Sequence, residues 1–598
     1  MKTLLVVMAG ALLMSGLAPS GALGQPPAKP AARSVATLRI GLWTLWHDKE
    51  ITVAPGADGQ ATLRTCATCA ASPLTHPMKI RANEGRLVLA ENREGADAVW
   101  LSGSVTLSAH AETLTLRNPV RISARAGQLV LVVTLPVESY VERVVASESG
   151  AADSAESLKA LAIVVRSFAL HQAHGHADYD LCDSTHCQLL HWGGGSGRGP
   201  AAHTATLATA GETLFYRGRR AQAWFHQNCG GRTATPQEVW PGEGAGGKPM
   251  PWLTSHVDAY CTTNGAREWT ADLSLSDLTN ALARAGLAHP GWSSLTVARR
   301  GESGRAVMLS VGSNGKSGGA QVSAEDFRLA VGRTLGWGKI LSTWFEVSSQ
   351  GDHFVFHGRG AGHGVGLCQA GAAAMSGLGR DSTQILAEYF PGAIAADEAT
   401  GRPWQTLQVQ GFVVETLNGA DTAYMRQVSQ ALAEAESRSG LKPAGSITVR
   451  TFPSTGAFRD ATLAPGWVAA FTEGNWIATQ PLATLAARKL LPSVLRHEFL
   501  HALIESQAGA NTPLWVREGL VEVLADGKGV GGGADLAPTI KLDQIDYVLA
   551  HAATETQSEA AHRAAAWYVA RLLAHFGRAQ VLSWLRSGLP GSAIDSLK

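Results

Sequence analysis

The segment from Gly358 to Ala372 reads GRGAGHGVGLCQAGA, with six glycines around the single histidine His363. Because glycine has no Cβ atom, such a run lets a ligand approach the backbone closely and permits positive φ angles. We therefore predict that this segment forms one wall of a binding cleft for a long polymer. A glycine-rich turn between ordinary strands is the alternative that the run alone leaves open.

The composition is that of a globular protein with several domains. The chain has 598 residues, of which 45% are hydrophobic and 17% charged, so it has room for three or four domains. The formal net charge is +1, and no run of Lys and Arg is present that could line a phosphate backbone. We therefore expect no nucleic-acid partner.

Residues 1–24 are typical of a cleaved secretory signal peptide. Lys2 precedes an apolar core, small residues lie near Ala22 to Gly24, and prolines follow. An uncleaved anchor is the alternative, but the apolar stretch is short, and no later segment has the length of apolar sequence that spans a bilayer. We expect a protein without a transmembrane segment after cleavage, secreted or located in the periplasm or cell envelope.

We expect the cysteines to lie in an oxidising compartment. Disulfides are the default there, and an odd number leaves one free thiol or one metal ligand. The glycine and asparagine residues around Cys229 and Cys261 favour a disulfide between these two. The seven cysteines are Cys66, Cys69, Cys182, Cys187, Cys229, Cys261 and Cys368.

A change of period at Pro136 separates a β-rich module, residues 36–135, from an amphipathic helix. Short apolar runs alternate with turn residues before Pro136, whereas apolar residues afterwards recur at helical spacing. Glu148 ends that apolar face, and burial there would raise the pKa of its carboxyl. An exposed charge at a helix end is the alternative.

A second helix, expected from about Ser154 to Gln172, carries Lys159 and Arg166 on one face. They could reach an anionic group, although two solvated charges would look the same in the sequence. The next segment holds two cysteines and two histidines, which suffice for a tetrahedral zinc site. A disulfide between the two cysteines is the alternative. These four residues are His176, Cys182, His186 and Cys187.

Three blocks in this order resemble the stage II sporulation protein D (SpoIID/LytB) family: PVESYVERVVASESG with KALAIVVRSFAL, then YDLCDSTHCQ, then GRGAGHGVGLCQAGA with EYFPG. The resemblance covers about residues 130–395. It implies a lytic transglycosylase that cleaves peptidoglycan glycan strands stripped of their stem peptides. The sequence departs from the commoner pattern at Ser149, where an apolar residue is usual, and at Cys368.

On the family's pattern the catalytic acid corresponds to Glu148, and the four Cys and His residues correspond to the positions that hold zinc in relatives. We expect that zinc to shape the cleft and not to polarise the scissile bond. We also expect four substrate-binding residues, which are Arg166, Arg359, His363 and Gln369.

The C-terminal part carries an independent signature, LLPSVLRHEFLHALIESQAG. His497 and His501 lie one helical turn apart, which lets both imidazoles bind one zinc ion, and Glu498 beside them is a candidate general base. The HExxH pattern also arises by chance. Followed by the helix TPLWVREGLVEVLA, it resembles the gluzincin metallopeptidases, and the resemblance implies Glu518 as third ligand, with Glu522 as the less favoured choice.

The preceding segment suits that resemblance. It predicts an amphipathic helix ended by Gly440, a strand SITVRTF, and a hairpin about Glu473 to Asn475; a last long helix is expected to end at Gly577.

We therefore predict a multidomain α+β protein. Its parts are the signal peptide (1–24), the β-rich module (36–135), a SpoIID-like catalytic domain (136–395), a polar linker (396–405) and a gluzincin-like domain (406–598).

The expected function is a secreted cell-wall enzyme with lytic transglycosylase activity and a zinc peptidase of unknown peptide substrate. Two alternatives remain: a glycan-binding module in which only the peptidase is active, and a structural envelope protein with both sites inert.

Overall fold

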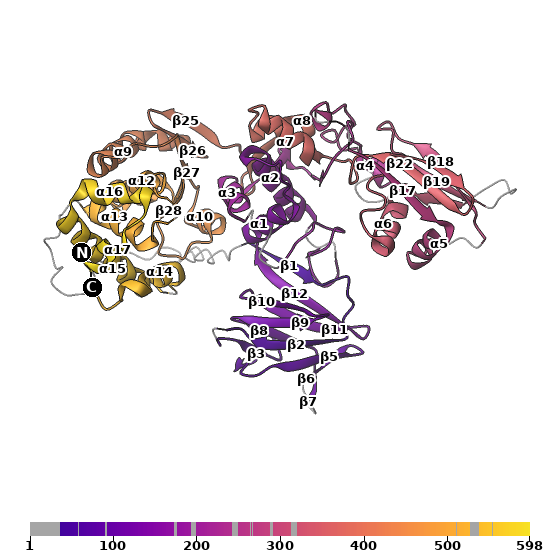
Figure 1. Ribbon diagram of the computed structural model, residues 1–598, viewed down its shortest axis with the longest axis horizontal. Helices are drawn as coiled ribbons and strands as arrows, with labels where there is room; N and C mark the ends of the chain where they lie inside the picture. Colours follow the sequence, from indigo (N-terminus) through magenta and orange to yellow (C-terminus); the bar gives the residue numbers. More distant parts are fainter. Residues whose placement is uncertain are drawn as a thin grey trace, which may run out of the picture. The chain divides into compact units, whose positions relative to one another are not determined.

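The computed structural model describes residues 36–597, except 58, 90–92, 173–175, 193–198, 242–248, 264, 266, 288–290, 313–319, 510, 527–537 and 553. The predicted signal peptide lies outside the described residues. The chain divides between Pro403 and Trp404 into two compact units, which we describe separately (Figure 1). Both contain helices and sheets, so the predicted α+β class is confirmed.

The first unit begins with two sheets that pack face to face. β5 and β6 of one sheet contact β11 and β12 of the other, and alternating side chains of both sheets fill the space between them. The first sheet has the order β13-β1-β12-β11-β8-β3-β4 and the second β10-β9-β2-β5-β6-β7. The bounds are β1 Thr37–Leu42, β2 Glu50–Pro55, β3 Thr62–Arg64, β4 Ser72–Pro73, β5 Met78–Asn83, β6 Arg86–Leu89, β7 Arg93–Ala96, β8 Ala98–Ser102, β9 Val105–Ala109, β10 Glu112–Leu116, β11 Val120–Arg125, β12 Gln128–Pro136 and β13 Leu181–Cys182.

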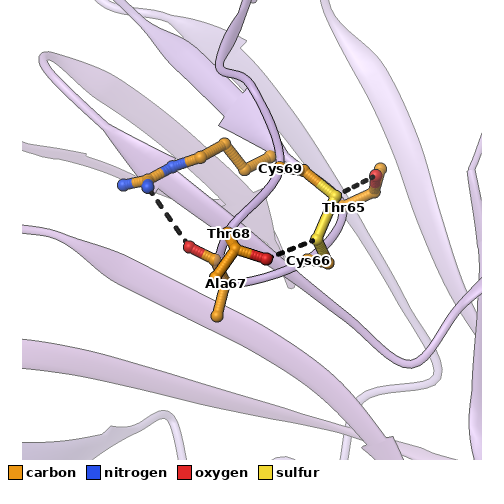
Figure 2. Close-up of a disulfide and its surroundings, with 6 residues drawn as sticks. Thr65, Cys66, Ala67, Thr68 and Cys69 are labelled. Carbon is orange, nitrogen blue, oxygen red and sulfur yellow. Dashed lines mark hydrogen bonds between the residues drawn. A yellow bond between two sulfur atoms is a disulfide. The ribbon is translucent and has the colours of Figure 1, made fainter.

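A short disulfide closes the turn after β3. Cys66 and Cys69 are joined, and the hydroxyls of Thr65 and Thr68 lie beside the two sulfurs (Figure 2). Both cysteines therefore belong to the turn itself and leave the other five available for other roles.

Helices follow the sandwich and carry the residues of interest. α1 contacts α2 and α3, while α2 also packs against α7 and α8. β24 pairs with β14, so the first residues of the predicted linker are strand. The bounds are α1 Val137–Glu148, α2 Ala155–Gln172, α3 Gly199–Ala208, β14 Glu212–Tyr216, β15 Arg219–Arg220, β16 Phe225–His226, α4 Pro236–Val239, η2 Tyr260–Thr262, β23 Leu367–Cys368, α7 Gln369–Gly377, α8 Ser382–Tyr389 and β24 Ala393–Asp397.

Residues 268–359 form an additional module with its own hydrophobic core, which the sequence analysis did not separate. Aromatic side chains dominate this core, including Trp269, Phe327 and Phe356. β22 pairs with β17 and β21, and β19 pairs with β18 and β20. The bounds are β17 Glu268–Ser274, α5 Leu275–Arg284, β18 Ser294–Arg300, β19 Ala306–Gly312, β20 Ala320–Ser323, α6 Ala324–Leu335, β21 Phe345–Gln350 and β22 His353–Arg359.

The second unit packs helices against a five-stranded sheet of order β25-β26-β27-β29-β28. Three local predictions are confirmed here. α9 ends at Gly440, which adopts a left-handed conformation; β28 and β29 form the hairpin; and α15 ends at Gly577. The bounds are β25 Gln405–Val409, β26 Phe412–Thr416, η3 Gly419–Tyr424, α9 Met425–Ser439, β27 Ile447–Thr451, α10 Thr455–Thr462, β28 Ala470–Glu473, β29 Trp476–Thr479, α11 Leu482–Ala487, α12 Leu491–Glu505, α13 Leu514–Asp526, α14 Leu542–His551, α15 Glu555–Phe576, α16 Arg578–Ser587 and α17 Gly591–Asp595.

Among the described residues, no helix combines the length and the apolar character needed to cross a bilayer.

Candidate functional sites

Glu148 is the last residue of α1, and its carboxyl is partly buried at the end of the apolar face. Burial raises the pKa of this carboxyl to about 7, although the backbone N–H of Leu189 donates to Oε1 at 3.2 Å and opposes the shift. The group can therefore carry a proton near neutral pH. This environment is the one that a general acid requires.

The glycine-rich segment reaches Glu148 through Gln369. The buried amide of Gln369, the first residue of α7, donates from Nε2 to the backbone oxygen of Glu148 at 2.9 Å. Leu189 comes from the segment that follows the Cys and His residues. The first and third sequence blocks, and the residue directly after the second, thus meet at Glu148.

The predicted zinc residues lie together. His176, Cys182, His186 and Cys187 each offer one ligand atom, and these atoms all lie within 4.8 Å of one another. Nε2 of His176 is 3.2 Å from Sγ of Cys187, and both cysteines are free thiols. The donor set of two sulfurs and two nitrogens suits zinc.

This cluster is tied to the glutamate by a short path along the chain. Cys187 is followed by Gln188, whose Oε1 accepts a hydrogen bond of 2.9 Å from the buried Tyr140 hydroxyl of α1. The next residue is Leu189, which donates to the Glu148 carboxyl. The cluster and the backbone that contacts the carboxyl are therefore two residues apart in the sequence.

The structure corrects the interpretation of the glycine-rich segment as an open wall. A Cβ atom at Gly366 would collide with the backbone oxygen of Trp224, and one at Gly364 would collide with the Arg305 guanidinium. β23 within the segment pairs in parallel with β16. The absent side chains make room for the protein's own backbone and for a buried arginine. The cleft-wall prediction is therefore wrong at these positions.

Two predicted substrate-binding residues of this segment have different surroundings. Arg359 is exposed, and its guanidinium stacks on the ring of Trp344 at 3.6 Å from the centroid. His363 lies beside the rings of His226 and Trp240, and its Nδ1 accepts a hydrogen bond from the N–H of Val365. Burial lowers the pKa of His363 to about 3, so its imidazole is neutral near pH 7.

Arg166 does not face a ligand, and both sequence interpretations of it are corrected. Its side chain is fully buried, and Nη2 forms an ion pair of 2.6 Å with Glu138 of α1. Nη1 donates to the backbone oxygen of Glu212 at 2.9 Å. The period of α2 turns Arg166 into the core, whereas Lys159 stays nearer the surface and pairs with Glu156.

The predicted disulfide between Cys229 and Cys261 is also corrected. Both are free thiols, and both lie beside Cys368 and Asp258 in one buried group. Pairing by sequence context failed because the third sulfur arrives from residues far along the chain, on β23.

In the second unit, α12 carries the HExxH residues. Nε2 of His497 and Nε2 of His501 are 3.1 Å apart, close to the roughly 3.3 Å expected for two nitrogens on one tetrahedral zinc ion. Glu498 is buried, which raises the pKa of its carboxyl, and Oε2 accepts a hydrogen bond of 2.6 Å from the Thr472 hydroxyl on β28.

Glu518 on α13 approaches the histidine pair. Its Oε2 lies 3.6 Å from Nε2 of His501. His562 on α15 was not identified from the sequence; its Nδ1 lies 3.6 Å from Glu518 and 3.2 Å from Oε1 of Glu522. A histidine among the alanines of a long helix was its signal in the sequence.

Comparison with known proteins supports the first resemblance. The family model described as Stage II sporulation protein (SpoIID) matches residues 125–216, and the model of a domain of unknown function, DUF8618, matches residues 252–366. Both ranges lie in the first unit.

Curated relatives agree with the family match. Stage II sporulation protein D of Bacillus subtilis is 26% identical over 297 residues, which cover 47% of this chain and 80% of that protein. An uncharacterised protein of Brachyspira hyodysenteriae is 27% identical over 272 residues, covering 45% and 69%. The amidase enhancer of Bacillus subtilis is 24% identical over 295 residues, covering 42% and 39%. The SpoIID part of the predicted resemblance is confirmed, and the gluzincin part stays a prediction.

Proposed function

We propose that the first unit is a peptidoglycan lytic transglycosylase of the cell envelope in which Glu148 is both general acid and general base. One observation carries this proposal: a partly buried carboxyl with its pKa raised to about 7 contacts Gln369 of the third family block and Leu189, the residue directly after the second. The SpoIID match and the relatives' names support a role at the cell wall.

A single carboxyl is sufficient for this reaction. Ordinary glycosidases use two carboxyls because one must activate water or attack the sugar. Here the C6 hydroxyl of the muramic acid attacks C1 of the same sugar. Protonated Glu148 gives its proton to the glycosidic oxygen as that bond breaks, and the resulting carboxylate takes the C6 hydroxyl proton. The product is a 1,6-anhydro sugar, and the intramolecular nucleophile supplies the proximity advantage.

The Cys and His cluster has a positioning role in this proposal. Its four residues would hold a zinc ion, and Tyr140 would fix Gln188 so that the N–H of Leu189 stays on the Glu148 carboxyl. Zinc here supplies structural stability and no Lewis-acid step.

Digestion of purified glycan strands, stripped of stem peptides, tests the proposal. Mass spectrometry should find anhydro-muramic ends after incubation with the intact protein and none with Glu148→Gln, which keeps the side-chain size. Glu142→Gln, on the same helix, is the matched control and should keep the activity. Strands bound by the wild type but left uncut would instead favour the glycan-binding module.

We further propose that the second unit is a zinc peptidase. The 3.1 Å approach of the two imidazole nitrogens and the nearby Glu518 favour it. Bound zinc would polarise the peptide carbonyl, and Glu498, held by Thr472, would accept a proton from the attacking water. β28 is at one end of its sheet, so its outer backbone groups could pair with an extended peptide.

Zinc content and peptide hydrolysis test this second function. Glu518→Ala should lose the ion and the hydrolysis of an unfolded protein substrate, whereas Glu522→Ala should keep the ion. If Glu518→Ala keeps the zinc and Glu522→Ala loses it, Glu522 is the third ligand and Glu518 is not. Wild-type protein that binds no zinc at His497 and His501 would refute the peptidase.

A further inference from the structure

A second buried group of metal-ligating side chains lies in the first unit, apart from the predicted zinc residues. Cys229, Asp258, Cys261 and Cys368 are all buried, and their ligand atoms all lie within 4.8 Å of one another. None of the four belongs to residues 125–216, which match the SpoIID family model. Three sulfurs and a carboxylate form a complete tetrahedral donor set.

The spacing suits a single ion. With metal–sulfur bonds of about 2.3 Å, two sulfurs on one tetrahedral zinc ion are roughly 3.8 Å apart, and the ligand atoms here all lie within 4.8 Å of one another. Asp258 is held in place at both oxygens: Oδ1 accepts from the N–H of Cys261 at 2.9 Å, and Oδ2 accepts from the Tyr389 hydroxyl at 3.0 Å. Oδ2 is also 3.2 Å from Sγ of Cys229.

Backbone amides point at the sulfurs. The N–H of Cys229 donates to Sγ of Cys368 at 3.2 Å, and the N–H of Gly231 donates to Sγ of Cys229 at 3.3 Å. Such donors stabilise negative charge on sulfur, which is the form that binds a metal. The pairing of β16 with β23 brings these two cysteines together.

A buried cation beside the group provides independent support. Arg305 is fully buried, and its Nη2 donates to the backbone oxygen of Cys229 at 2.6 Å. Its Nε and Nη1 have no hydrogen-bond partner among the described residues. A buried guanidinium requires nearby negative charge. Glu238 and Glu325 supply part of it, and three thiolates and a carboxylate around a divalent ion would add a net charge of about −2 by simple count.

We propose that Cys229, Asp258, Cys261 and Cys368 bind a structural zinc ion. The three thiols lose their protons when the ion binds, so binding releases protons to solvent. In the sequence, Cys261 precedes the module of residues 268–359 and Cys368 follows it. The ion would therefore join both ends of this module to the segment that carries Cys229, and closing such long loops restricts the unfolded chain. This proposal does not depend on either proposed activity.

Metal analysis of the full mature chain tests the site directly. A parent variant lacking the other candidate ligands (Cys182→Ser, Cys187→Ser, His497→Ala, His501→Ala) should still hold one zinc equivalent. Adding Asp258→Asn or Cys368→Ser should remove it, whereas adding Cys66→Ser with Cys69→Ser should not. Exchange for Co²⁺ should give sulfur-to-cobalt charge-transfer absorption that disappears with the same ligand variants.

Thiol alkylation of the wild-type protein tests the site without relying on variants that fold poorly. Cys229, Cys261 and Cys368 should resist an alkylating reagent until a strong chelator is added, and each should then be modified. A disulfide between any two of them in peptides from native, unreduced protein would overturn the proposal. A metal-free parent variant with three thiols would overturn it equally.

Discussion

The two candidate active sites place a glutamate on a helix in opposite ways. Glu498 lies within α12 and next to its histidines, and Glu518 comes from the next helix along the chain. Glu148 ends α1, and its neighbours Leu189 and Gln369 come from segments far away in the sequence. Helical spacing is enough to bring together the two histidines beside Glu498. The site around Glu148 forms only when segments far apart in the sequence are folded together.

The comparison implies that the two sites should respond differently to mutation. A site built on consecutive helices should depend mainly on its own ligands, because helix geometry fixes their spacing. A site built from distant segments should also depend on buried contacts that hold those segments in place.

The largest effects should come from the two glutamates, and they should be independent. Glu148→Gln should lower glycan cleavage by about 10²–10⁴-fold and leave peptide hydrolysis intact, because general acid catalysis contributes that much. Glu498→Ala should lower peptide hydrolysis, leave glycan cleavage intact and keep the zinc ion of the second unit. Rates of both reactions in both variants provide the measurement. A loss of both reactions in either variant would contradict two separate sites.

Removal of the buried Arg166 side chain should destabilise the first unit strongly. Arg166→Ala leaves Glu138 buried without its partner, so we expect a loss of about 3–5 kcal/mol in unfolding free energy. Lys159→Ala, two turns earlier on the same helix, should cost under about 1 kcal/mol because its pair is solvent-accessible. Denaturant unfolding of the full chain measures both, and equal losses would show that Arg166 is not a core residue.

Glycan cleavage should lose rate at alkaline pH because Glu148 must carry a proton. Glu148 must begin the cycle protonated, and burial raises the pKa of its carboxyl to about 7. The glycan-cleavage rate should therefore be constant below that pH and fall about tenfold per unit above it, to about a hundredth at pH 9. A profile of kcat/KM measured between pH 5 and 9 tests this. A rate that rises through this range would mean that the ionised carboxylate starts the reaction.

The smallest effect should come from Gln369, which positions Glu148 through its backbone. Gln369→Ala should lower kcat for glycan cleavage by about tenfold with little change in KM, since a shift of the acid affects the reaction more than binding. Gln384→Ala, at the start of α8, is the matched control and should leave both constants unchanged. A rise in KM alone would instead assign Gln369 to substrate binding.

Local sequence patterns predicted helices in both units. In the second unit, helix ends at Gly440 and Gly577 follow from the conformational freedom of glycine, and the two histidines of HExxH share one face by spacing alone. In the first unit the helical period predicted α1 but not that Arg166 points into the core, because a charged residue enters a core only when a partner such as Glu138 arrives from another element.

Some residues of the candidate sites could not be identified from the sequence, again because their partners come from other elements. His562, Thr472 and Leu189 contact the candidate sites from other elements, and none of them belongs to a recognisable spacing. The module of residues 268–359 was also missed, because its strands resemble those of the unit around it and only a separate aromatic core distinguishes it.

The tight packing of the glycine-rich segment affects how mutational surveys should be interpreted. Alanine at Gly366 would push β23 away from the Trp224 backbone, and alanine at Gly364 would displace Arg305. An inactive glycine variant would therefore report a misassembled protein and would say nothing about carbohydrate contact. Informative scans of this motif are those that trim existing side chains, such as the exposed Arg359.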